Sequence, residues 1–391
     1  MIYFFVLTLT LYFVFRYDIC KKKKGLVLSY KLLLILAVLI MGCRYVVGGD
    51  TVRYIRYFDF YPKLGDEMNL FSYVFFDPGW LLLNSIIKTV YDDFIFFQFV
   101  HAVLLNGFVF FFIWKKTKYR FTVVLFYFLY QYLYFNTEIL RESLAVICFL
   151  FASDYYIDKK WSKYYLVVSI AFLFHSSAFI LFLYPFCRYI RFSYLNIFLM
   201  LVGNILLWGY LNDIFSYLFV NPLIAQKFEY YQGLGMNING KILRFVEYVL
   251  FPFILVYYNR KKLLGKIDKY DPIYMLYFFI ATTMVANTAI AGRMINYIVF
   301  YMLLYYVDAL YRLRLPQNLL AFVFFFTLPI LPNANYYAGD LSYVRSGLKF
   351  YHRWYPYTDI FHRFDKNQKN IVEQRIEDAD RAMELETSFR K

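Results

Sequence analysis

Residues 94–120 have the sequence FIFFQFVHAVLLNGFVFFFIWKKTKYR, an apolar run that ends in a cluster of lysine and arginine. About 20 apolar residues are enough to cross the hydrocarbon core of a bilayer as one helix. Basic residues are concentrated in the cytoplasmic loops of membrane proteins. The stretch therefore predicts a transmembrane helix whose C-terminal end faces the cytoplasm.

The whole chain has the same apolar character. Of its 391 residues, 61% are hydrophobic and 24% are aromatic, more than a soluble domain could bury. The formal net charge of +15 could indicate a nucleic-acid partner. Most Lys and Arg residues lie in short loops, however, which the positive-inside rule and anionic headgroups explain. We therefore predict an all-α, polytopic transmembrane helical bundle in contact with membrane lipids and without nucleic acid.

The basic clusters predict the orientation of the spans. We place Lys21–Lys24, Lys115–Arg120 and Arg260–Lys262 in the cytoplasm, so that the loops 48–93 and 212–241 are external. We expect residues 1–15 to be retained as the first helix, because they lack a basic n-region and a cleavage site. About ten spans are predicted: the first helix, 29–47, 94–114, 121–135, 137–157, 195–211, 242–258, 272–290, 293–311 and 317–333. They form a transmembrane domain over 1–335, and 336–391 is a polar, partly helical tail.

Two further helical segments are not expected to span the membrane. Asp77-Pro78-Gly79-Trp80 is a helix-start signal, with Asp77 as N-cap, for a short amphipathic helix over 78–91 at the outer face. Residues 164–187 have basic residues on both flanks, so we predict a re-entrant hairpin that turns at His175-Ser176-Ser177. Non-helical backbone at that depth survives only where it is buried or lines a cavity.

Charged and titratable residues in or beside the apolar segments are the candidate site. Such groups cost several kcal/mol in hydrocarbon and usually have a function. Alternatives stay open: Arg44 could pair with Asp50 or snorkel to headgroups, and Glu138 with Arg141 could be a local ion pair. His175 could be a hydrogen-bonded structural residue. The candidates are predicted near the outer face: Arg44, Asp50, Arg53, Glu138, Arg141, His175 and Arg293.

Several other chemistries are not indicated. The four cysteines have no CxxC spacing, and the chain has no P-loop and no GxSxG elbow. The acidic pairs at Asp92-Asp93 and Asp268–Asp271 contain no DxD triplet. We therefore predict neither a metal nor another cofactor. Tyr230 and Tyr231 could stack on sugar rings, although 43 tyrosines make no single one specific.

Five short motifs occur in the order found in one family. Gly42-Cys43-Arg44-Tyr45-Val46-Val47-Gly48-Gly49-Asp50 resembles the G-x-R-Y-x-x-G-x-D signature of EpsG-like polysaccharide polymerases, a branch of the Wzy-type repeat-unit polymerases. Asp77-Pro78-Gly79 is similar to their E-P-G element, and Arg141-Glu142-Ser143-Leu144-Ala145 to their R-Q-x-x-A. Phe174-His175-Ser176-Ser177-Ala178 is similar to their F-H-x-S-A, and Gly292-Arg293 matches a late arginine. The resemblance covers about residues 1–335, and it departs at Asp77 (usually Glu) and Glu142 (usually Gln).

The resemblance implies a GT-C-like helical fold and a substrate. The substrate would be an oligosaccharide repeat unit on undecaprenyl pyrophosphate, polymerised into an O-antigen, capsule or exopolysaccharide at the outer face of the bacterial cytoplasmic membrane. A flippase and a chain-length regulator would be partners. Arginines would stabilise the negative charge of the departing pyrophosphate, so neither nucleotide nor metal is needed.

The residue roles follow from this chemistry. We expect Asp50, Arg141, His175 and Arg293 to be catalytic, with His175 or Asp50 as the base that takes the proton of the attacking hydroxyl. We expect five residues to bind substrate: Arg44, Arg53, Glu138, Tyr230 and Tyr231. Two alternatives are a ligase for another acceptor and a flippase or transporter of the same lipid. A transporter should have inverted repeats, and the sequence has no visible repeat.

Overall fold

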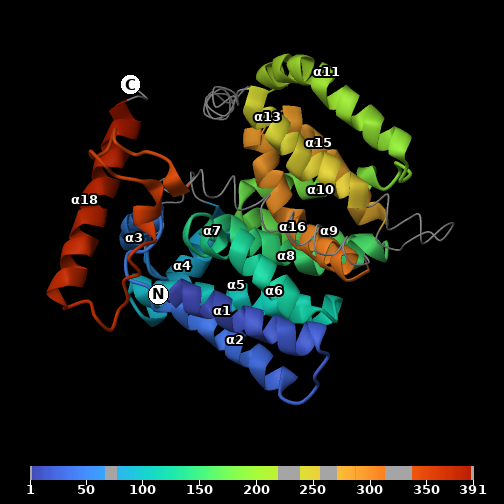
Figure 1. The fold of residues 1–391 in the computed structure, drawn as a ribbon. Coiled ribbons are helices and arrows are strands. Elements are labelled where there is room, and N and C mark those ends of the chain that lie inside the picture. The colour runs from blue at the N-terminus through green and yellow to red at the C-terminus, as the bar shows by residue number, and fades with distance from the viewer. Residues whose placement is uncertain are drawn as a thin grey trace. The chain divides into compact units, whose positions relative to one another are not determined.

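The computed structural model describes residues 2–66, 77–218, 238–255, 271–286, 288–312 and 337–388 (Figure 1). Every regular element in these ranges is a helix, which confirms the predicted all-α class. The predicted span 317–333, and Tyr230 and Tyr231 in the predicted loop 212–241, lie outside the described residues.

Three described helical segments are long and apolar enough to cross a membrane. They are Ile2–Ile19, formed by α1 (Ile2–Phe13) and a π-helical turn, α5 (Phe94–Lys116), and Gly292–Arg312 within α16 (Thr288–Arg312). The number of ten spans stays a prediction. Shorter apolar helices are α2 (Leu26–Gly42), α6 (Arg120–Tyr130), α9 (Trp161–Phe174), α10 (Phe179–Cys187) and α15 (Asp271–Ala286). A further short apolar stretch is Tyr194–Leu206 within α11 (Tyr194–Leu218).

The chain forms two compact units, and the first contains Met1–Ile147, Leu173–His175 and Phe324–Lys391. In it α1 packs on α6, and α2 packs on α5. A buried hydrogen-bonded triad holds α5, α6 and α7 (Tyr132–Thr137) in register. Tyr127 Oη donates to Asn106 Oδ1 at 2.9 Å, and Asn106 Nδ2 donates to Asn136 Oδ1 at 2.9 Å. Buried amides need such partners, so this triad favours one packing arrangement.

Two short helices lie in the region predicted as the external loop 48–93. α3 (Thr51–Phe60) is not among the helices predicted from the sequence. α4 (Pro78–Val90) begins at Pro78 as predicted. Asp77 occupies the N-cap position as predicted, but its side chain makes no capping hydrogen bond. The carboxylate pairs with Arg141 instead.

The C-terminal segment packs against the turn that follows α2. Its helix α18 (Lys366–Ser388) lies beside α3 (Figure 1). Three backbone hydrogen bonds of 2.8–3.0 Å tie residues 353–360 to residues 43–48. Val46, Val52 and Val372 form a buried apolar cluster between the two segments. The helix expected in the tail is present, but one face of it is packed rather than solvated.

The second unit contains Cys148–Phe172 and Ser176–Val323, with α15 packed on α11 and α16. Its remaining helices are most of α8 (Leu140–Ile157), α13 (Ile238–Arg244) and a π-helix at Phe245–Leu250. After α9 a short 3-10 helix, Ser176–Ala178, leads into α10. Tyr164 Oη donates to the Leu181 carbonyl at 2.7 Å, and the Arg188 guanidinium lies 5.9 Å from the Trp161 ring. The chain therefore reverses at the predicted turn; its depth in a membrane stays a prediction.

Candidate functional site

The turn that follows α2, residues 43–50, carries most of the family signature and is named the signature turn. Its packing requires Gly48 and Gly49. Gly48 has a φ of +114°, a backbone conformation that residues with a side chain rarely adopt. A Cβ at this position would also clash with Thr137. A Cβ on Gly49 would lie 2.7 Å from Glu138 Oε2 and 2.8 Å from a terminal nitrogen of Arg353. Both positions therefore need glycine because the neighbouring groups approach the backbone closely.

Glu138 and Arg353 meet at Gly49 from distant parts of the sequence. Glu138 is 9% exposed, lies between α7 and α8, and accepts a 2.5 Å hydrogen bond from the Gly49 backbone N–H. Arg353 belongs to the C-terminal segment, and its carbonyl accepts from the Gly48 N–H at 2.8 Å. A carboxylate and a guanidinium thus converge on one backbone position of the signature turn.

Arg44 is buried beneath this turn, with 1% of its surface exposed. Its Nε donates to the Val47 carbonyl at 3.3 Å, and one terminal nitrogen donates to the Met41 carbonyl at 2.5 Å. The other terminal nitrogen has no hydrogen-bond partner within the described residues. Arg44 therefore neither pairs with Asp50 nor snorkels, and its position supports the turn. A contact with substrate stays a prediction.

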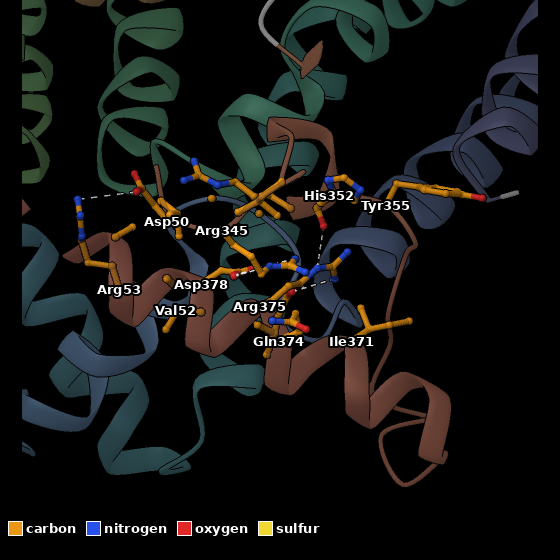
Figure 2. A pocket seen from close by; sticks show the side chains of 18 of the residues that line it. Asp50, Val52, Arg53, Arg345, His352, Tyr355, Ile371, Gln374, Arg375 and Asp378 are labelled. Atoms are coloured by element: carbon orange, nitrogen blue, oxygen red, sulfur yellow. Dashed lines mark hydrogen bonds and ion pairs between the residues drawn. The ribbon is translucent and has the colours of Figure 1, made fainter. Parts of the chain in front are cut away.

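A cavity of about 400 Å³ lies between the signature turn, residues 344–356 and α18 (Figure 2). Two predicted site residues line it, Asp50 and Arg53, whose charged groups are 3.8 Å apart. On another wall, Arg345 forms a two-pronged ion pair with Asp378, with both N–O distances 2.9 Å. The cavity therefore mixes donors with acceptors.

Arg375 joins the walls of this cavity. Its guanidinium donates to the carbonyls of His352 at 3.0 Å, Val46 at 3.1 Å and Pro356 at 2.7 Å, and to Thr358 Oγ1 at 2.9 Å. Burial lowers the pKa of Arg375 to about 10, so the side chain remains cationic at neutral pH. It acts as a clamp between α18 and the signature turn.

Arg141 lies at the start of α8 and pairs with Asp77. Its terminal nitrogen is 3.1 Å from Asp77 Oδ2, and its side chain is 31% exposed. The partner is therefore not Glu138, as the local ion-pair alternative required. The sequence marked Asp77 as a helix cap and as part of a family motif, and neither feature indicated its contact with Arg141.

The Asp77-Pro78-Gly79 element packs against the helix end that leads into His175. A Cβ on Gly79 would lie 2.9 Å from the Leu173 carbonyl oxygen. This close approach, which only glycine permits, brings the first turn of α4 to the end of α9. Within the first unit, the segments of Asp77, Arg141 and His175 are therefore neighbours.

Arg293 belongs to the second unit. It lies one helical turn before Tyr297 on α16, and the Tyr297 hydroxyl is 2.8 Å from Ser177 Oγ. A Cβ on the preceding Gly292 would meet nothing within 4 Å, so there is open space beside the backbone at this position. In the described part of the chain, no group of three or more His, Cys, Asp or Glu side chains could hold a metal ion.

Three arginines of the C-terminal segment were missed as candidates: Arg345, Arg353 and Arg375. The signal in the sequence was a set of basic residues in the tail. The number of predicted spans places this tail outside, so its positive charge opposes the positive-inside trend. Their partners are far away along the chain, so spacing gave no indication of the contacts.

Comparison with protein families matches residues 27–359 to the EpsG family. The match extends past the predicted end of the transmembrane domain at 335 and includes Arg353 and Thr358, whose carbonyls accept hydrogen bonds from the signature turn. No curated protein and no solved structure matches the chain. The protein belongs to the EpsG family of Wzy-like polysaccharide polymerases.

Proposed function

We propose that this membrane protein joins oligosaccharide repeat units carried on undecaprenyl pyrophosphate into an O-antigen, capsule or exopolysaccharide at the outer face of the bacterial cytoplasmic membrane. The observation that carries the proposal is the partly exposed Arg141, held by Asp77 beside the chain reversal at His175. An arginine anchored on one side can use its remaining N–H groups on phosphate oxygens.

The proposed reaction exchanges one C–O bond for another. A hydroxyl oxygen of the acceptor saccharide forms a bond to the anomeric carbon of the donor. The bond from that carbon to the pyrophosphate oxygen breaks, and its electron pair leaves with undecaprenyl pyrophosphate. Arg141 and Arg293 would stabilise the growing negative charge. The hydroxyl proton would go to His175 or Asp50.

The remaining candidates would position the substrate. Glu138 fixes the Gly49 backbone and thereby the signature turn, and Arg53 lines the cavity with Asp50. We propose that both act on the saccharide part of the substrate. Tyr230 and Tyr231 stay proposed stacking residues. A flippase and a chain-length regulator of the same pathway would act before and together with the polymerase.

The test uses purified protein in lipid vesicles with lipid-linked repeat units as the only substrate, and products resolved by size. A polymerase yields a ladder of lipid-linked chains whose lengths are multiples of the repeat unit. A ligase yields single transfers onto a supplied second acceptor, and a flippase moves the lipid without changing its size. Absence of a ladder under conditions in which either of those outcomes occurs would reject the proposal.

A further inference from the structure

We infer that the cavity between α18 and the signature turn is a saccharide-binding subsite built partly by the C-terminal segment. The inference rests on the proposed function, in which this subsite would hold sugar rings of the acceptor. It adds a site to the cluster around Arg141, and its ligand is a polyhydroxylated ring rather than a pyrophosphate.

The cavity is lined by one face of α18. Asn370, Gln374 and Asp378 follow each other at four-residue spacing, which places them on one side of the helix. The opposite wall carries Asp50 and Arg53 at the start of α3. Figure 2 shows Gln374 and Asp378 on α18 and Asp50 with Arg53 at one end of the cavity.

The side-chain amides of Asn370 and Gln374 favour a ligand that carries hydroxyl groups. Within the described part of the chain, the amides of Asn370 and Gln374 have no hydrogen-bond partner, so they are available to a ligand. A carboxamide offers both donors and an acceptor. A sugar hydroxyl likewise donates and accepts, whereas a phosphate oxygen at neutral pH accepts almost exclusively. The two amides therefore match a saccharide better than an oxyanion.

The charged groups lead to the same ligand class. Four arginines line the cavity, and each has a partner within the protein. Arg345 is engaged by Asp378, and Arg375 is engaged by three carbonyls and a hydroxyl. Arg53 lies 3.8 Å from Asp50, and Arg353 meets Glu138 at Gly49. An oxyanion would have to displace these contacts and would face the carboxylates of Asp50 and Asp378, which repel it. Those same carboxylates can accept hydrogen bonds from hydroxyl groups.

Apolar side chains complete the subsite. Val46, Val52, Ile371 and Met383 line the cavity beside the polar groups. Sugar rings have C–H faces that pack on such surfaces. Tyr355 also lines the cavity and is 57% exposed, so its ring is available to a ligand. The volume of about 400 Å³ lies in the range typical of small-molecule sites.

The experiment measures binding by isothermal titration calorimetry to the purified full-length protein in nanodiscs. The two probes are the repeat-unit oligosaccharide, released from the host's lipid carrier by mild acid, and inorganic pyrophosphate. The double variant Asn370→Ala/Gln374→Ala removes both available amides. We expect its Kd for the oligosaccharide to rise about tenfold or more, because each amide can contribute more than one hydrogen bond. The control Asn367→Ala/Lys369→Ala changes exposed residues near the start of the same helix, outside the cavity lining, and should leave the Kd unchanged.

The outcomes separate this inference from the proposed function. Unchanged oligosaccharide affinity in the double variant, or pyrophosphate binding that the double variant abolishes, would overturn the saccharide subsite. Trypsin resistance of α18 in each variant checks that its docking is intact. If the wild-type protein makes no polymer but the double variant loses oligosaccharide binding, the proposed function fails and the subsite stands. If polymerisation kinetics are normal in the double variant, the subsite fails and the polymerase stands.

Discussion

At the scale of single residues, the site depends on close approaches that only glycine allows. Gly49 admits a carboxylate and a guanidinium to one face of its Cα. Gly79 admits the Leu173 carbonyl. The sequence contains the glycine pair, but its pattern could not identify Arg353 as a neighbour of Gly49, because over 300 residues separate the two. A glycine in a sequence can indicate a close contact, but it does not identify the residue that makes the contact.

We expect Gly49→Ala to destabilise the signature turn and abolish polymerisation. The new methyl group would overlap Glu138 and Arg353, and such overpacking costs about 1–3 kcal/mol. Thermal unfolding in detergent and the polymer ladder are the two measurements. The control is Gly107→Ala in α5, where a Cβ meets nothing within 4 Å and helix propensity favours alanine. Equal melting temperatures for the two variants would show that the turn tolerates a side chain.

We expect Arg141→Lys and Arg293→Lys to lower the polymerisation rate at least tenfold while the protein still accumulates in the membrane. Lysine keeps the positive charge but lacks the planar fork that binds two phosphate oxygens. The control Arg363→Lys changes an exposed arginine outside the cavity lining. Normal ladders from both variants would reduce these arginines to general electrostatic anchors. A parallel loss of protein abundance in Arg141→Lys would instead assign the Asp77 pair to folding.

The identity of the base predicts a pH dependence. The pKa of free histidine is about 6.5 and that of free aspartate about 3.9. A His175 base would therefore lose activity at higher pH than an Asp50 base as the solution is acidified. Rate against pH, with excess chelator, is compared for wild type, His175→Ala and Asp50→Asn. Rescue of a chelator-inhibited enzyme by a divalent ion would overturn the metal-free mechanism, and near-normal rates in both variants would exclude both residues as the base.

At the scale of elements, local patterns predicted the helices better than their partners. The start of α4 at Pro78 and the chain reversal at His175 follow from local signals, a proline at the first helical position and a polar tip in apolar sequence. The packing of α18 on α3 does not, because an amphipathic charged helix can be covered by any apolar surface. For the same reason the saccharide cavity could not be derived from sequence.

The hydrogen bonds of Arg375 are expected to hold α18 against the signature turn. Arg375→Lys should weaken its docking by about 2 kcal/mol or more, because lysine cannot reach all four acceptors and hydrogen bonds from charged donors each contribute about 1.5–3 kcal/mol. Limited trypsin digestion should release the tail faster than in the wild type. The control Lys369→Arg, at an exposed position of the same helix, should be cleaved at the wild-type rate. Identical digestion of both variants would show that the apolar contacts alone hold α18.

At the scale of the whole molecule, the direct contact of the C-terminal segment with the signature turn constrains the topology. Two segments joined by backbone hydrogen bonds must lie on the same side of a membrane. Counting the predicted spans also places both outside, although the last of them lies beyond the described residues. The two arguments are independent. The contact shows that the tail and the signature turn lie on the same side of the membrane, and the loop charges predict that this side is the outside.

Labelling of single cysteines in a cysteine-free background tests both arguments at once. We expect Lys63→Cys and Lys369→Cys, at exposed positions, to react with an impermeant maleimide in intact spheroplasts. Lys22→Cys, in the predicted cytoplasmic cluster, should react only after lysis. Opposite accessibility at 63 and 369 would exclude the packing of the C-terminal segment on the signature turn, and with it the saccharide cavity. Shared accessibility only after lysis would preserve that packing but invert the orientation, which would end the proposal of a polymerase that acts at the outer face.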